Sequence, residues 1–291
     1  MKNWILASRP KTLWAGACPV MLGTAMAFDA GLMHVPSALA ALLGALLIQI
    51  GTNFANDYYD GLKGTDDENR KGPPRAVASG LITSETMKRA MIVTMLLVFV
   101  PGAYILWRGG VPFLIIGIVS ILSGIAYTGG PYPLAYNGLG DIFALVFFGP
   151  VAVAGTYYLQ IYAVPPEVII AGFAPGLFSV AILTVNNLRD IEGDAKAGKK
   201  TLAVRFGAGF SRFEYVVSLF AATLVIPVGL SLYTGAHYLS IVSGVTFLLA
   251  IPAYIAIVHH AADGPIMNAT LANTGKYLLI FTILFSVGWI L

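Results

Sequence analysis

Long apolar stretches alternate with short polar ones along this 291-residue chain. The apolar stretches match the roughly 17 to 25 residues that an α-helix needs to cross a bilayer. A membrane-spanning β-barrel is excluded, because the strict alternation of apolar and polar residues that its strands require is missing. Nine spans are predicted, at residues 12–29, 36–57, 86–107, 111–127, 139–161, 167–188, 213–233, 238–259 and 273–291. In the sixth, Gly172 and Gly176 have the spacing of a close helix contact.

Composition supports this picture and narrows the class of protein. Hydrophobic residues make up 57% of the chain and charged residues only 11%, against roughly 25% in soluble domains. We therefore expect an all-α, polytopic membrane protein, a single domain over residues 1–291 with about nine helices around a central cavity. The net charge of +3 is small, so nucleic acid is not expected as a partner, and the lipid bilayer is.

Basic residues predict the orientation of the spans. If the N-terminus is cytoplasmic, every Lys and Arg except Arg108 falls on the cytoplasmic side. This predicts a multi-pass protein of the inner, cytoplasmic membrane with its C-terminus on the opposite side. The central cavity and both acid-rich segments would then open to the cytoplasm.

Two segments rich in amides and carboxylates follow apolar windows far apart in the chain. They are NFANDYYDGLKGTD (Asn53–Asp66) and NNLRDIEGD (Asn186–Asp194). Their polar residues recur at steps of three and four, so each helix end presents several oxygens on one face. The residues concerned are Asn53, Asn56, Asp57 and Asp60 in the first segment and Asn186, Asp190 and Asp194 in the second.

Oxygen ligands without His or Cys favour a hard cation, magnesium or calcium. Magnesium commonly binds one or two carboxylates and leaves its other positions to water and phosphates. Basic residues follow both segments, namely Lys63, Arg70, Lys71 and Arg75 after the first and Lys199, Lys200 and Arg205 after the second. Two such helix ends facing each other would form a clamp for a diphosphate. For the single charges Asp66, Asp67, Glu68, Lys196 and Lys199, a solvated loop is the competing interpretation.

At these residues the chain resembles the UbiA family of intramembrane aromatic prenyltransferases, whose signatures are NDxxDxxxD and a later DxxxD. The likeness continues through SRPKTL (Ser8–Leu13), GLGDIFALVFFG (Gly138–Gly149) and AKAGKKTLAVRFG (Ala195–Gly207). Gly64 replaces the last aspartate of the first signature, and Asp66 follows two positions later. That form is similar to the branch of the family that prenylates 1,4-dihydroxy-2-naphthoate.

The resemblance implies an enzyme and a reaction. A polyprenyl group would pass from polyprenyl diphosphate to 1,4-dihydroxy-2-naphthoate, with loss of diphosphate and carbon dioxide, giving demethylmenaquinol for menaquinone biosynthesis. Magnesium is the implied cofactor, with two ions bridging the diphosphate. Another aromatic acceptor, such as 4-hydroxybenzoate or homogentisate, is the alternative within this class. A membrane transporter is the alternative from another class, because intramembrane carboxylates often mark ion paths.

The resemblance also assigns residues. The implied metal ligands are Asn56, Asp60, Asp190 and Asp194. Asp57 lies beside these ligands, and Arg75 matches the family's diphosphate-facing arginine. Asn53, Lys63 and Lys200 are further candidates for diphosphate contact, and Asp57, Tyr127 and Asp141 are the candidate catalytic residues. Arg9 and Lys11 are candidates for the acceptor's carboxylate, with an orientation signal as the competing interpretation.

Asp141 is a candidate acceptor of a hydroxyl proton, and a helix N-cap is its competing interpretation. The loop YTGGPYPLAY contains Tyr127 but lacks the lysine that many relatives place there, so Lys63 or Lys200 is expected to supply the missing charge. Tyr127, Phe147 and Tyr157 are candidate aromatic walls for an allylic cation.

Overall fold

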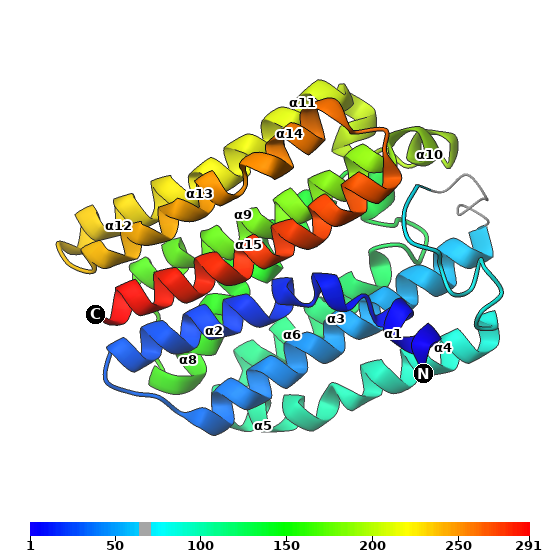
Figure 1. The fold of residues 1–291 in the computed structure, drawn as a ribbon. Coiled ribbons are helices and arrows are strands. Elements are labelled where there is room, and N and C mark those ends of the chain that lie inside the picture. Colours follow the sequence, from blue (N-terminus) through cyan, green and yellow to red (C-terminus); the bar gives the residue numbers. More distant parts are fainter. Residues whose placement is uncertain (64–70) are drawn as a thin grey trace.

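Helices account for every regular element in residues 1–63 and 71–291, which are the residues that our computed structural model describes, except for the side chain of Lys63 (Figure 1). The elements of the N-terminal half are α1 (Lys2–Ser8), η1 (Pro10–Thr12), α2 (Trp14–Asp29), α3 (Val35–Lys63), α4 (Ser84–Leu97), α5 (Phe99–Gly109), α6 (Val111–Ala126), η2 (Ala135–Asn137), α7 (Gly140–Val146), η3 (Phe147–Val151) and α8 (Ala152–Ile161). Those of the C-terminal half are α9 (Pro166–Arg189), α10 (Ile191–Lys196), α11 (Leu202–Phe220), η4 (Ala221–Val225), α12 (Ile226–Thr234), η5 (Tyr238–Gly244), α13 (Val245–Leu249), α14 (Ile251–His259) and α15 (Gly264–Ile290).

The predicted apolar windows coincide with these helices. Within the described part of the chain, seven helical segments are long and apolar enough to cross a membrane. The two remaining windows fall on shorter helices, α2 and α6. The expectation of an all-helical protein with several spans is therefore confirmed. The count of nine crossings and the side on which the cavity opens stay predictions.

Helix α9 is the centre of the bundle. Of its most apolar 18-residue window, 72% is buried, against 22% to 44% in the other candidate spans of the described residues. A helix that is apolar all round is expected in such a position. Figure 1 shows α9 and α15 in the middle, with α11 to α14 on one side and α2 to α6 on the other. The two halves of the chain thus meet where α2, α7, η3 and α8 contact α9 and where α2 contacts α15.

Small residues let α9 approach the π-helical turn η3 closely. A methyl group on Gly176 would lie 2.4 Å from the carbonyl oxygen of Leu145, and one on Gly172 would lie 2.7 Å from Cα of Pro150. The predicted close contact at this glycine pair is present. This contact fixes α7 and η3 against α9. Both α7 and η3 carry residues of the candidate site.

The candidate site lies at one end of the bundle. The last turn of α3, the end of α9 and the short helix α10 all reach this end, whereas the C-terminus lies at the other end (Figure 1). The two acid-rich segments are therefore brought to the same end of the molecule, as their positions in the sequence predict.

Replacing Gly176 by Ala tests the close contact. The added methyl group has to displace backbone, so we expect a loss of stability of about 1–3 kcal/mol. Gly229 in α12 is the matched control, because a methyl group there meets nothing within 4 Å. Thermal unfolding in detergent should show a lower midpoint for Gly176→Ala and an unchanged one for Gly229→Ala. Equal midpoints would contradict the contact.

Candidate active site

A cavity of about 430 Å³ extends along the bundle from its acid-rich end. Its lining on α3 runs from Ala41 to Asp60, about 28 Å of helix at 1.5 Å per residue. Apolar side chains line most of it, including Ile48, Ile105 and Phe113. Its polar end is lined by Asn56, Asp60, Arg75, Asp190, Asp194 and Lys199. A charged head with an apolar tail would match this division.

Lys199 connects the two acid-rich segments at the polar end. Its ammonium nitrogen lies 3.7 Å from Oδ2 of Asp60 and 3.5 Å from Oδ1 of Asp194. Because one ammonium group contacts both carboxylates, the end of α3 and α10 face the same space. The structure thus brings together two predicted metal-ligating segments that are distant in the sequence.

Asp60 is the most enclosed carboxylate of the site. Its side chain is 0% exposed, and Arg75 donates a hydrogen bond of 2.8 Å to Oδ2. The hydroxyl of Tyr136, in the loop after α6, donates to Oδ1 over 3.3 Å. Burial of a carboxylate is tolerated when it is paired and hydrogen-bonded in this way.

Asp190 is held by its neighbour in the chain. Nε and Nη2 of Arg189 donate to its two carboxylate oxygens over 2.8 and 2.5 Å, the parallel geometry that suits a guanidinium group. The same guanidinium donates to the side-chain oxygens of Asn186 and Asn268. Arg189 is almost fully buried. Together with Asn268 it ties the end of α9 to α15.

Asp57 lies outside the cavity lining. Its two carboxylate oxygens accept hydrogen bonds from the backbone N–H groups of Ala76 and Val77, both over 3.0 Å. It therefore anchors the turn that begins at Arg75, and Arg75 in turn reaches Asp60. These contacts are those of a positioning residue. Asp57 was predicted to be catalytic, but its side chain does not line the cavity.

Asn53 lines the cavity and also holds the backbone near Arg9. Its amide donates 3.0 Å to the carbonyl oxygen of Ser8, and Gln49, one turn earlier on α3, donates 2.7 Å to that of Thr12. These two bonds hold the chain on both sides of Arg9, whose backbone is left-handed with φ 51°. That conformation is uncommon for a residue with a side chain. Arg9 itself lines the cavity.

Two of the predicted lysines are placed away from the cavity. Lys200 is exposed, and its backbone N–H donates to the carbonyl oxygen of Tyr136. Lys11 is also exposed, and neither lines the cavity in the described residues. The side chain of Lys63 lies outside the described residues, as does Asp66. Lys199 takes the place that was expected for Lys200.

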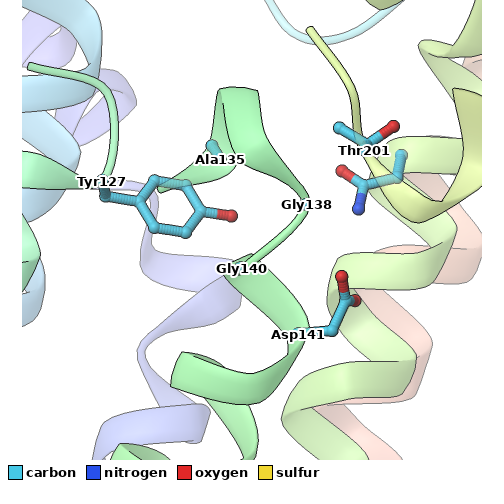
Figure 2. Close-up of a pocket in the computed structure, with 7 residues that line it drawn as sticks. Tyr127, Ala135, Gly138, Gly140, Asp141 and Thr201 are labelled. Atoms are coloured by element: carbon cyan, nitrogen blue, oxygen red, sulfur yellow. The ribbon is translucent and has the colours of Figure 1, made fainter. Parts of the chain in front are cut away.

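Tyr127 and Asp141 meet at a second, much smaller pocket of about 10 Å³, the size of one water molecule. Figure 2 shows Tyr127 and Asp141 on either side of the turn from Gly138 to Gly140. Tyr127 lines both this pocket and the large cavity, whereas the lining of the large cavity, among the residues described, excludes Asp141. Oδ1 of Asp141 is buried without a hydrogen-bond partner.

The aromatic walls differ in part from the expectation. Phe147 lines the large cavity, and Phe143 stacks on it with ring centroids 5.8 Å apart. Tyr157 is buried in the apolar core instead. The aromatic pair next to the polar end thus comes from α7 and η3.

Burial shapes the electrostatics of the polar end. Desolvation raises the pKa of Asp194 from its ordinary range to about 6, with further increases from the charges of Asp190 and Asp60, while Lys199 lowers it. These carboxylates therefore resist being ionised together without added positive charge. A cation or a basic side chain has to accompany them.

The donor set fits magnesium. Carboxylates of Asp60, Asp190 and Asp194 and the amide oxygen of Asn56 reach the polar end, all of them hard oxygen donors. No three His, Cys, Asp or Glu residues of the described chain are clustered closely enough to hold a metal by themselves. This spread suits magnesium, which takes few carboxylates and completes its shell with water and phosphate oxygens.

Several residues of the site were missed or undervalued in the sequence. Lys199 was named only as one of several basic residues after the second acid-rich segment, Arg189 was counted only for orientation, and Tyr136 and Thr128 carried no signal. Thr128 donates 2.9 Å to Oδ1 of Asn56 and so orients this amide. The available signal for Lys199 was its place five residues after Asp194.

Comparisons with known proteins agree with this geometry. Residues 17–289 match the UbiA prenyltransferase family. The chain is similar to the 1,4-dihydroxy-2-naphthoate octaprenyltransferase of Escherichia coli K12, with 39% identity over 98% of this chain and 94% of the relative. The enzyme with the same description from Haemophilus influenzae is 37% identical to this chain, over 99% of this chain and 96% of the relative.

A solved structure shares the fold. A UbiA homologue from Archaeoglobus fulgidus, bound to DMAPP and Mg²⁺, superposes with a TM-score of 0.59 at 16% identity, covering 97% of this chain and 99% of that one. At this identity the likeness concerns the fold. It confirms the helical architecture along nearly the whole chain.

Replacing Asp57 by Ala tests its role as an anchor. Two hydrogen bonds to a charged acceptor are lost, so we expect a loss of stability of about 2–4 kcal/mol, and an intermediate loss for Asp57→Asn. Glu85→Gln is the control, because its ion pair with Arg89 is exposed. Thermal unfolding in detergent without ligands measures all three. An Asp57→Ala variant as stable as the control would refute the anchoring role.

Proposed function

This chain belongs to the UbiA prenyltransferase family, and we propose that it transfers a polyprenyl group from polyprenyl diphosphate to 1,4-dihydroxy-2-naphthoate. Diphosphate and carbon dioxide leave, and the product is demethylmenaquinol, an intermediate of menaquinone biosynthesis. The identity of 37% to 39% with enzymes of this description supports the choice of acceptor. The multi-span fold supports a site within a membrane, and we assign it to the cytoplasmic side of the inner membrane from the positions of the basic residues.

One observation carries the proposal. Asp60, near the end of α3, and Asp194, in α10 just after α9, both contact Lys199 at the polar end of a long apolar cavity. A polyprenyl diphosphate has the same division into charged head and apolar chain. A transporter would place its carboxylates near the middle of the membrane, in broken helices. Here they lie at one end of the bundle, beside basic side chains.

We propose that two magnesium ions are held by Asn56, Asp60, Asp190 and Asp194. When bound, they supply positive charge that stabilises the departing diphosphate. The chain adds its own cations to this task. Arg75, which already contacts Asp60, is placed to donate to phosphate oxygens, and Asp57 keeps its turn in position. Donors fixed before the reaction stabilise developing charge without reorganisation.

Cleavage of the allylic C–O bond leaves a carbocation on the prenyl chain. Phe143 and Phe147 line the cavity next to the polar end, and their faces would stabilise this charge and exclude water. The ring carbon that bears the acceptor's carboxylate then forms the new C–C bond. Its bond to the carboxylate breaks, carbon dioxide leaves, and the electron pair restores the aromatic ring.

Arg9 and Tyr127 are the proposed contacts of the acceptor. Arg9 reaches the cavity from a backbone held by Asn53 and Gln49, which suits a guanidinium that binds a carboxylate. Tyr127 lines the large cavity and the small pocket of Asp141. We propose that the acceptor's hydroxyl donates to Tyr127, and that Asp141 acts through this tyrosine and does not contact the acceptor.

Product analysis tests the reaction. Purified protein with magnesium, farnesyl diphosphate and 1,4-dihydroxy-2-naphthoate should give a prenylated naphthol lighter by one carbon dioxide than the simple adduct, detected by mass spectrometry. 4-Hydroxybenzoate and homogentisate serve as competing acceptors, and chelation of divalent ions should abolish turnover. Product from another acceptor only, or turnover without divalent ions, would refute the proposal.

Replacing Arg9 by Ala tests acceptor binding. Loss of a charged hydrogen bond should raise KM for the naphthoate about 10- to 100-fold and leave KM for the prenyl diphosphate unchanged. Lys11→Ala is the matched control, because Lys11 is exposed and lies two residues away. Steady-state kinetics with each substrate varied separately distinguishes the two constants. An equal rise of both constants in Arg9→Ala would contradict the assignment.

A further inference from the structure

Lys199 occupies an unusual position for a lysine. Its ammonium group lies between two acid-rich segments, within 3.7 Å of Asp60 and 3.5 Å of Asp194. The side chains of Asp60, Asp194 and Lys199 are at most 12% exposed. Lysine is strongly hydrated and seldom buried without a reason. Here it supplies positive charge at the place where the proposed function requires divalent ions.

The surroundings hold Lys199 in this position. Its backbone N–H donates a hydrogen bond of 2.8 Å to the carbonyl oxygen of Asp194. The backbone N–H of Lys200 donates one of 2.9 Å to the carbonyl oxygen of Tyr136. The ring of Tyr136 lies under the ammonium group at 5.1 Å from its centroid. The hydroxyl of the same tyrosine donates to Asp60. Backbone, ring and carboxylates therefore form a built site for one cation.

The other cations of the site are fixed more firmly. Arg189 is bound to Asp190 through two parallel hydrogen bonds and to Asn268, and the turn of Arg75 is anchored by Asp57. Unlike the rigid fork of an arginine, the ammonium group of a lysine is a point charge on a flexible four-carbon stem. Among the cations of the site in residues 71–291, Lys199 is thus the one that can move away from its carboxylates while its backbone stays in place.

We propose that Lys199 is the resident counter-cation of Asp60 and Asp194, that divalent metal displaces its ammonium group, and that the released group then binds the diphosphate. The diphosphate part rests on the proposed function, whereas the exchange with metal rests on the contacts above. Lys199 also supplies the charge that the loop containing Tyr136 lacks. The site consequently keeps its two halves together before substrate arrives.

Lys199→Gln tests the exchange, with Lys200→Gln as the matched control on the adjacent, exposed lysine. Without divalent ions, Lys199→Gln should lower the unfolding midpoint in detergent, because Asp194 then loses the ammonium group that accompanies it, whereas Asp60 keeps Arg75. Magnesium chloride alone should bind this variant about 5- to 50-fold more tightly than wild type in calorimetry, because the competing cation is gone. Magnesium affinity that is unchanged or weaker in folded Lys199→Gln overturns the proposal.

Inorganic pyrophosphate is the probe for the second part of the proposal, the binding of diphosphate by the released ammonium group of Lys199. At saturating magnesium, Lys199→Gln should bind it about tenfold more weakly than wild type and Lys200→Gln, because a charge-assisted hydrogen bond is lost. Equal affinity in all three overturns the role of Lys199 as a diphosphate ligand. None of these measurements uses the aromatic acceptor. A wild type that fails to prenylate the naphthoate would therefore refute the proposed reaction and leave the exchange standing.

A measurement on wild type covers the case in which Lys199→Gln does not fold. Acetylation by an amine-reactive ester, followed by mass spectrometry, gives the labelling rate of each lysine. The rate of Lys199 should rise when magnesium is added and fall again with pyrophosphate, while that of Lys200 stays constant. A Lys199 rate that magnesium does not raise overturns the proposal.

Discussion

Carboxylates gathered at one end of an apolar bundle require positive charge beside them, and the site is organised by this requirement. Asp60, Asp190 and Asp194 converge on a cavity whose other walls are mainly apolar. Their mutual repulsion in a partly desolvated place is offset by Arg75, Arg189 and Lys199. Arg75 pairs with Asp60, Arg189 pairs with Asp190, and Lys199 lies between Asp60 and Asp194. The folding of this end and its affinity for a charged ligand thus depend on the same balance.

Around this balance, polar side chains of α3 also hold backbone in place, and Gln49 and Asn53 do so while lining the cavity. Asp57 anchors the turn of Arg75, while Gln49 and Asn53 anchor the chain on both sides of Arg9. The close approach of α9 to η3 at Gly172 and Gly176 fixes the wall that carries Phe147. One helix, α3, therefore carries metal-ligand candidates and the supports of two basic residues.

Helix geometry made part of the site predictable from sequence. Spacings of three and four placed Asn56 and Asp60 on one face, and the apolar windows located the helices that bring Asp190 and Asp194 to the same end. Helical spacing and apolar windows can be read from the sequence alone, because they do not depend on which other elements pack against the helix.

Other features depend on tertiary contacts that spacing does not contain. Lys199 and Lys200 are adjacent and chemically identical, and the backbone bonds of both residues, to Asp194 and to Tyr136, accompany the placement of the Lys199 ammonium group beside Asp60. Asp57 belongs to the same signature as Asp60, yet it turns to the backbone of Ala76 and Val77. The left-handed backbone of Arg9 follows from amides on a different helix.

The short helix α1 has a practical consequence. It is about 10 Å long at 1.5 Å per residue, and it is all that separates Met1 from the turn of Arg9. The other chain terminus lies at the opposite end of the bundle (Figure 1). A purification tag or fluorescent fusion placed ahead of Met1 would therefore sit close to the turn of Arg9, which lines the cavity, whereas one placed after Leu291 lies at the other end of the bundle (Figure 1).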